Sequence, residues 1–157
     1  MPKITVRADS AYRKQVSARC LREAARRTLA SESVPDEVEL TIVVTGDQEI
    51  RDLNRRYRGV DSPTDVLAFG GGETDARFVA APGESACLGD VIVSYPRAKA
   101  QARSGGHSVA DELQLLVVHG VLHLVGYDHA EPDEKRKMWA AQNKALRELG
   151  AQKMGRE

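Results

Sequence analysis

The sequence of 157 residues is poor in the features that mark several specialised protein classes. It has two cysteines, Cys20 and Cys87, which lie far apart and match neither a redox motif nor a structural zinc motif. No apolar run approaches the roughly 20 residues needed to cross a bilayer, and the N-terminus lacks the apolar segment of a secretory signal. We therefore expect a cytoplasmic protein with reduced thiols and no membrane partner.

Aromatic residues and excess charge are also scarce. Aromatic side chains make up 4% of the residues, and 23 basic residues balance 23 acidic ones, so the formal net charge is zero. A polyanion would therefore have to be held by local basic patches, with little stacking of bases on aromatic rings. The apolar fraction of 41% and the charged fraction of 29% are ordinary for a globular domain.

The alternation and periodicity of apolar residues predict one α+β domain over residues 1–150, followed by a flexible tail at 151–157. The strands are expected over 3–6, 37–45, 65–69 and 88–95. The helices are expected over 11–30, 47–56 and 96–103, after Ser108 through the apolar stretch 113–125, and from Pro132 onward. This order favours a small mixed β-sheet packed with helices around a central apolar helix. The glycine-rich segment 70–85 is expected to be a long loop.

Three of the four histidines lie in one short run, H-G-V-L-H-L-V-G-Y-D-H. His119 and His123 are four residues apart, so a helix places them on one face. Gly126 allows the helix to end and the chain to bring His129 back to the same point. Three neutral imidazoles make a tridentate site that leaves zinc an open fourth position. We predict one Zn²⁺ per chain, although imidazole nitrogen also suits nickel, copper and iron.

The ligand spacing H-x-x-x-H-x-x-G-x-x-H is that of the metzincin proteases. Those enzymes carry a glutamate directly after the first histidine, where it takes a proton from the metal-bound water. Here this position is Gly120, which favours a substrate other than a peptide. Asp128 either accepts a hydrogen bond from a ligand N–H, as an outer partner of the metal ligands, or caps the turn. His107 is expected to be solvated.

Arg58 is the second candidate for a catalytic role. We expect it in a turn past the end of the helix over 47–56. A guanidinium is a planar, permanently charged fork that suits phosphate, so Arg58 could hold a scissile phosphate and stabilise its developing charge. The alternative is an ordinary surface pair with Asp61 or Asp65.

Basic side chains on the first two helices are candidates for binding an RNA backbone. They are Arg22, Arg26, Arg55 and Arg56. They could follow a line of phosphates, or they could be an ordinary solvated face.

Three sequence motifs occur in order along the chain. The first is L-N-x-x-Y-R-x-x-D-x-P-T-D-V-L from Leu53 to Leu67, the second is L-G-D-V-I-V-S from Leu88 to Ser94, and the third is the histidine run. Together they resemble the YbeY family of bacterial rRNA-maturation endoribonucleases. The sequence departs from the family after Leu67, where the usual serine, phenylalanine and proline are replaced by A-F-G.

The resemblance implies a single-strand-specific, metal-dependent endoribonuclease that acts on ribosomal RNA, especially near the 3′ end of precursor small-subunit rRNA, and in ribosome quality control. It implies zinc as the metal, the small ribosomal subunit and assembly factors as partners, and roles in activity for Arg58 and His119. The general base stays unassigned, and either a metal-activated water or the ribose 2′-OH is the nucleophile. One rival is a zinc peptidase or other metal hydrolase that uses Glu112 or Glu131. Another is a non-catalytic, zinc-stabilised ribosome assembly factor.

Overall fold

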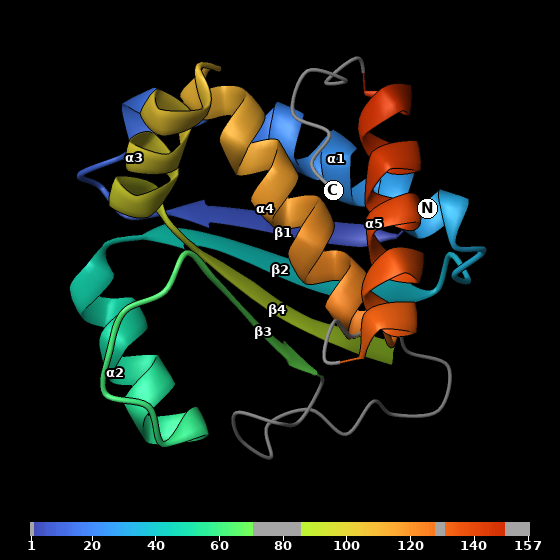
Figure 1. Ribbon diagram of the computed structural model, residues 1–157, viewed down its shortest axis with the longest axis horizontal. Coiled ribbons are helices and arrows are strands. Elements are labelled where there is room, and N and C mark those ends of the chain that lie inside the picture. The colour runs from blue at the N-terminus through green and yellow to red at the C-terminus, as the bar shows by residue number, and fades with distance from the viewer. Residues whose placement is uncertain (1, 71–85, 128–130, 150–157) are drawn as a thin grey trace.

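The structure is a computed structural model that describes residues 2–70, 86–127 and 131–149 (Figure 1). Its strands are β1 (Lys3–Ala8), β2 (Val38–Thr45), β3 (Val66–Gly70) and β4 (Ala86–Ser94). Its helices are α1 (Ala18–Ser31), α2 (Asp47–Arg58), α3 (Tyr95–Gly105), α4 (Val109–Leu124) and α5 (Pro132–Glu148), with a short 3-10 helix η1 (Arg13–Gln15). The predicted α+β order is confirmed. The predicted tail at 151–157, and the predicted loop beyond Gly70, lie outside the described residues.

The four strands form one mixed sheet in the order β1-β2-β4-β3. β1, β2 and β4 run parallel, whereas β3 is antiparallel to β4 and forms an edge of the sheet. One face of the sheet is apolar because successive side chains of a strand point to opposite faces. In β2, Val38, Leu40, Ile42 and Val44 are buried on one face, and the residues between them are partly exposed.

Helices cover the two faces of the sheet unequally. α1 and α4 pack on the apolar face, and α5 packs on both of these helices (Figure 1). In α4, Val117, Val118, Val121 and Leu122 have no exposed surface, which confirms the expected central apolar helix. α2 covers part of the opposite face, where Ile50 contacts a smaller apolar cluster from β3 and β4.

Among the helix boundaries that differ from the sequence prediction, two have a clear local cause. α1 begins at Ala18 and not at 11, because the Ser17 hydroxyl accepts a hydrogen bond from the Cys20 amide at 3.2 Å and caps the helix there. α2 continues to Arg58, since the chain only reverses at Gly59, which has the left-handed φ of 71° typical of a helix C-terminus. The prediction that Arg58 lies in a turn was therefore wrong, and it is the last residue of α2.

The start of α4 was predicted correctly, because the Ser108 hydroxyl accepts a hydrogen bond from the Asp111 amide at 3.1 Å. The expectation that His107 is solvated was wrong. Its side chain is 7% exposed, and its Nε2 lies 2.5 Å from Oε1 of Glu112, which is itself buried at the start of α4. In the part of the chain that the structure describes, no helix is long and apolar enough to span a membrane.

Candidate functional site

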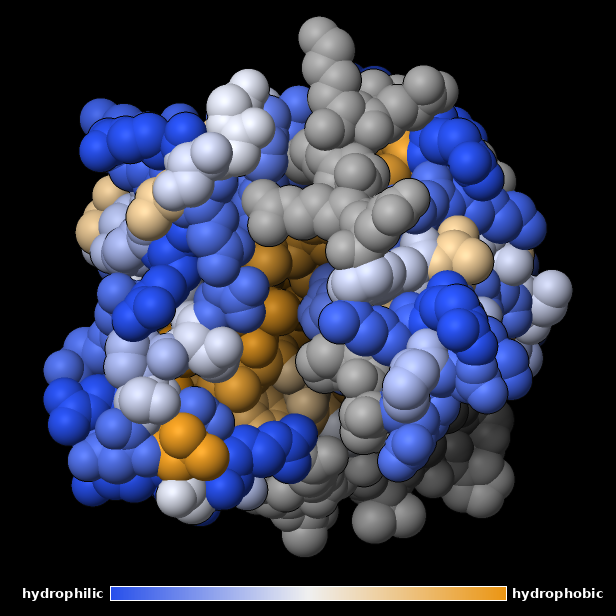
Figure 2. All heavy atoms as spheres, in the orientation of Figure 1, coloured by the Kyte–Doolittle hydropathy of each residue, from blue (hydrophilic) through white to orange (hydrophobic). Residues whose placement is uncertain are grey.

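A cleft of about 790 Å³ lies between α4 and the edge strand β3. Arg58, Asp65, His119 and His123 contribute polar side chains to its walls, and Val66, Ala68 and Leu124 contribute apolar surface. Figure 2 shows a hollow with an apolar floor between hydrophilic rims, on the face where α4 crosses β3 and β4. The cleft thus brings together groups from helices and strands that are far apart in the sequence.

The first two predicted metal ligands face this cleft from the C-terminal half of α4. The ring centroids of His119 and His123 are 4.8 Å apart, with an angle of 72° between the ring planes. The third predicted ligand, His129, and its neighbour Asp128 lie outside the described residues. Among residues 2–70, 86–127 and 131–149, no three side chains of metal-ligating type form a cluster, so the three-histidine site stays a prediction.

Arg58, the last residue of α2, lines the cleft together with residues of β3 and α4. Its Nη2 donates a hydrogen bond to the Ala68 carbonyl at 2.8 Å, and its guanidinium carbon lies 4.7 Å from the centre of the Phe69 ring. The carbonyl bond and the cation–π contact together fix the guanidinium at the mouth of the cleft.

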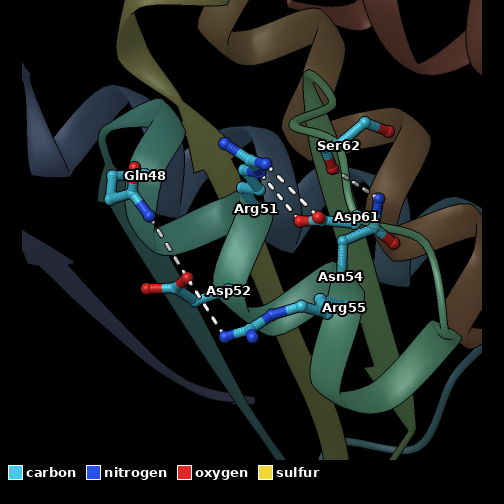
Figure 3. A network of polar contacts seen from close by, with 7 residues as sticks. All are labelled: Gln48, Arg51, Asp52, Asn54, Arg55, Asp61 and Ser62. Carbon is cyan, nitrogen blue, oxygen red and sulfur yellow. Dashed lines mark hydrogen bonds and ion pairs between the residues drawn. The ribbon is translucent and has the colours of Figure 1, made fainter.

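Asp61, one of the two surface partners considered for Arg58, pairs instead with Arg51. Figure 3 shows this pair, with Arg51 Nε and Nη2 donating to the two carboxylate oxygens of Asp61 at 2.8 and 3.3 Å. The hydrogen bond from Arg51 lowers the pKa of the exposed Asp61 carboxyl. In the same network, the Asn54 amide donates to the Ser62 carbonyl at 2.9 Å. These bonds tie the segment between α2 and β3 back to α2.

Asp65, at the end of that segment, has a more central place than the sequence indicated. It lines the cleft and also a smaller cavity of about 200 Å³ that extends beside His119. Its Oδ2 accepts a hydrogen bond from Gln101 Nε2 at 3.2 Å, and its carbonyl accepts one from the Ser94 amide at 2.8 Å. Sequence reasoning considered Asp65 only as a partner of Arg58, although its place in the motif P-T-D-V-L was a signal.

The four arginines predicted to bind RNA do not form one continuous surface. Arg22 and Arg26 lie on α1, which packs beside β1 on the apolar face of the sheet. Arg55 and Arg56 lie on α2, which packs on the other face near β3 and β4. Because the two pairs are separated by the sheet, one line of phosphates would have to wrap around the molecule to reach both. Their RNA-binding roles stay predictions.

The turn after α4 is attached to the C-terminal end of α1. The Tyr127 hydroxyl donates a hydrogen bond to Glu32 Oε1 at 2.7 Å, and this bond raises the pKa of Tyr127 above its ordinary value. Tyr127 also packs against the larger core. The bond to Glu32 adds a fixed point directly before the segment that contains His129.

Gly120 occupies the position of the metzincin glutamate, and the fold leaves no room for a side chain there. A Cβ atom at this position would lie 2.6 Å from Val91 Cγ1 and 3.1 Å from Val91 Cγ2. Val91 belongs to β4 and has no exposed surface, so moving it aside would disturb the packing of the core. The close approach of α4 to the sheet therefore explains the glycine. The peptidase alternative would need Glu112 or Glu131 as its base. Glu112 contacts His107, and Glu131 is exposed directly before α5.

Gly120→Glu should lower the free energy of unfolding by at least about 3 kcal/mol, because it overpacks the interface and buries a carboxylate. Gly120→Ala should cost less, since overpacking by one methyl group costs about 1–3 kcal/mol and alanine returns about 1 kcal/mol of helix propensity. Chemical denaturation measures both. In the double variant Gly120→Ala/Val91→Ala, the two changes should cost less than their sum, because removing the valine methyl groups makes room. Wild-type stability in Gly120→Glu would contradict the close approach.

Comparison with known proteins gives a consistent result. The family model described as "Endoribonuclease YbeY" matches residues 3–150. A protein of that name from Chloroflexus aurantiacus is 48% identical over 128 residues, covering 81% of this chain and 83% of the relative. Another, from Dehalococcoides mccartyi, is 42% identical over 145 residues, covering 88% of this chain and 84% of the relative.

The fold also matches a solved structure. The solution structure of TM1509 from Thermotoga maritima superposes with a TM-score of 0.60 at 27% sequence identity, covering 93% of this chain and 88% of that protein. The family match extends from β1 to α5 and therefore includes the described strands and helices that line the cleft. The chain belongs to the Endoribonuclease YbeY family.

Proposed function

We propose that this chain is a metal-dependent endoribonuclease that cleaves single-stranded RNA. The observation that carries the proposal is the cleft in which His119, His123 and Arg58 meet, in a chain whose relatives are named endoribonucleases. A cleft of about 790 Å³ is in the range of small-ligand sites, so it suits a few nucleotides of a flexible strand better than a rigid duplex.

Zinc is the proposed metal, with His119, His123 and His129 as its ligands. The described residues fit this role, since two imidazoles lie side by side on one helix face and Nδ1 of His119 is held at 3.1 Å by Oε1 of Gln142. This bond directs the other ring nitrogen, Nε2, away from Gln142. When bound, zinc would supply positive charge to the phosphodiester and lower the pKa of a water molecule.

Arg58 is proposed to bind the scissile phosphate. Its attachment to Ala68 and Phe69 holds a permanent positive charge at the cleft, which would stabilise the negative charge that develops on the phosphate in the transition state. The apolar floor of the cleft strengthens this interaction, because it excludes water from around the charges.

Ribosomal RNA is the proposed substrate class, with the 3′ end of precursor small-subunit rRNA as the preferred region. The small ribosomal subunit and its assembly factors are the proposed partners, and the cytoplasm is the proposed location. The support for these finer statements is the resemblance of the three sequence motifs to bacterial rRNA-maturation enzymes.

The test uses the purified full chain with its metal content quantified. Single-stranded RNA, the same sequence as a duplex, and unfolded casein are incubated separately, each with and without a chelator. We expect cleavage of the single strand only, with loss of cleavage in chelator and recovery on adding zinc. Casein cleavage that the chelator abolishes would favour the peptidase. Intact RNA at full zinc occupancy would favour the non-catalytic assembly factor.

A further inference from the structure

Gln142 is a buried polar residue on the apolar side of α5. The residue is 5% exposed, and its neighbours on that side of the helix, Met138, Ala145 and Leu146, are buried in the larger core. An amide in such a place loses its hydrogen bonds to water and needs a protein partner to offset that cost. The position is therefore unexpected for packing alone, and its partner indicates what the amide does.

The partner is His119 on α4. Oε1 of Gln142 lies 3.1 Å from Nδ1 of the imidazole. An amide oxygen can only accept a hydrogen bond, so this contact is a hydrogen bond only in the tautomer with the ring proton on Nδ1. In a neutral imidazole the other nitrogen, Nε2, then carries a lone pair. Because the two nitrogens point to different sides of the ring, the lone pair is directed away from α5.

We propose that Gln142 is a positioning residue that fixes the tautomer and orientation of His119, so that Nε2 is always presented as a metal ligand. The inference rests on the proposed function in so far as the ligand role of His119 does. A protein acceptor on the second ring nitrogen raises the basicity of a ligating imidazole and limits its rotation. α5 thereby takes part in the site although none of its described side chains lines the cleft.

A second amide in the same region provides a matched control. Gln101 of α3 lines the cavity of about 200 Å³ together with Gln142 and His119, but it donates its hydrogen bond to Asp65. Replacing Gln101 by methionine removes an amide from this cavity without removing the acceptor of His119. Methionine suits both positions because it is unbranched, similar in length to glutamine and favourable in helices.

The experiment compares wild type with Gln142→Glu, Gln142→Met and Gln101→Met. Gln142→Glu keeps the acceptor, so zinc affinity should stay within about threefold of wild type or increase, whereas Gln142→Met should weaken it about 10- to 100-fold. Gln101→Met should stay within about threefold of wild type. Affinity is measured by competition with a chelating dye, and circular dichroism checks that each variant is folded.

The tautomer is measured directly in metal-free protein by long-range ¹H–¹⁵N NMR of the imidazole rings, at a pH where they are neutral. The His119 signal is assigned by its loss in His119→Ala. We expect a protonated Nδ1 in wild type, Gln142→Glu and Gln101→Met, and a shift toward protonated Nε2 in Gln142→Met. Protonated Nε2 in wild type overturns the inference, as does an unchanged tautomer and zinc affinity in Gln142→Met. If Gln142→Met does not fold, wild type and Gln142→Glu still decide, since a glutamine that donated to the ring could not be replaced by glutamate.

The tautomer measurement requires neither zinc nor RNA. A protonated Nδ1 in a protein that cleaves no RNA would therefore reject the proposed function while leaving the assignment of Gln142 to His119 intact. A protonated Nε2 in a protein that cleaves RNA would reject the assignment of Gln142 to His119 while leaving the proposed function intact.

Discussion

His119→Ala should reduce the cleavage of single-stranded RNA by at least about 10³-fold, since the stabilisation of transition-state charge by a metal is worth several kcal/mol. The variant removes one of two imidazoles that lie 4.8 Å apart in the cleft and leaves Gln142 without its ring partner. Zinc content after dialysis and cleavage rates at saturating zinc are the two measurements. Both should fall together, because the loss of activity follows from the loss of a ligand.

A change on the same helix provides the control for His119→Ala. Gln114 is a half-buried residue of α4 that lies outside the lining of the cleft. Gln114→Ala should keep wild-type zinc content and cleavage, since alanine is the best helix former. Full RNA cleavage by His119→Ala would identify a contaminating nuclease as the source of activity. It would also contradict the proposal that His119 is a metal ligand needed for cleavage.

Arg58→Ala should lower the rate of RNA cleavage by about 10²–10³-fold while zinc binding remains at the wild-type level, because a residue that stabilises charge in the transition state contributes that much. Stability should change little, by about 1 kcal/mol, since Arg58 is exposed and its contacts include a hydrogen bond to the Ala68 carbonyl and a cation–π contact with Phe69. Single-turnover cleavage at saturating RNA measures the effect on the chemical step.

Arg58→Lys distinguishes geometry from charge. Lysine keeps the positive charge but lacks the planar fork that binds two phosphate oxygens, so we expect partial activity between wild type and Arg58→Ala. Arg97 is a matched control, because it is an exposed arginine of α3 that pairs with Asp47 at 3.5 Å and does not line the cleft. Arg97→Ala should leave the cleavage rate unchanged. An equal loss in Arg97→Ala and Arg58→Ala would reduce the role of Arg58 to non-specific charge.

The elements of the fold were largely predictable because their signals are local. The alternation of β2 identifies a strand with one buried face, and the caps at Ser108 and Gly59 involve residues within a few positions of each other. The wrong start predicted for α1 also has a local cause. The apolar pattern extends the helix upstream of Ser17, but the cap formed by the Ser17 hydroxyl starts the helix there. The error for His107 has another cause, because its burial depends on the partner Glu112 in the following helix.

The sequence by itself determined which chemistry is available. The spacing of His119 and His123 places two imidazoles on one helix face through the helical repeat alone, and the motif around Arg58 marks a phosphate-binding candidate. These are short-range patterns, and the tertiary structure only had to fold the helix for the histidines to become neighbours.

The tertiary structure alone decided what surrounds that chemistry. Arg58 lines the same cleft as the histidines because β3 is an edge strand and lies between α2 and the cleft, and the sequence does not state the strand order. Gly120 became explicable through Val91, and His119 gained an acceptor from Gln142, which is 23 positions further along the chain. Such contacts depend on how helices pack on a sheet, and no local preference of the chain encodes that packing.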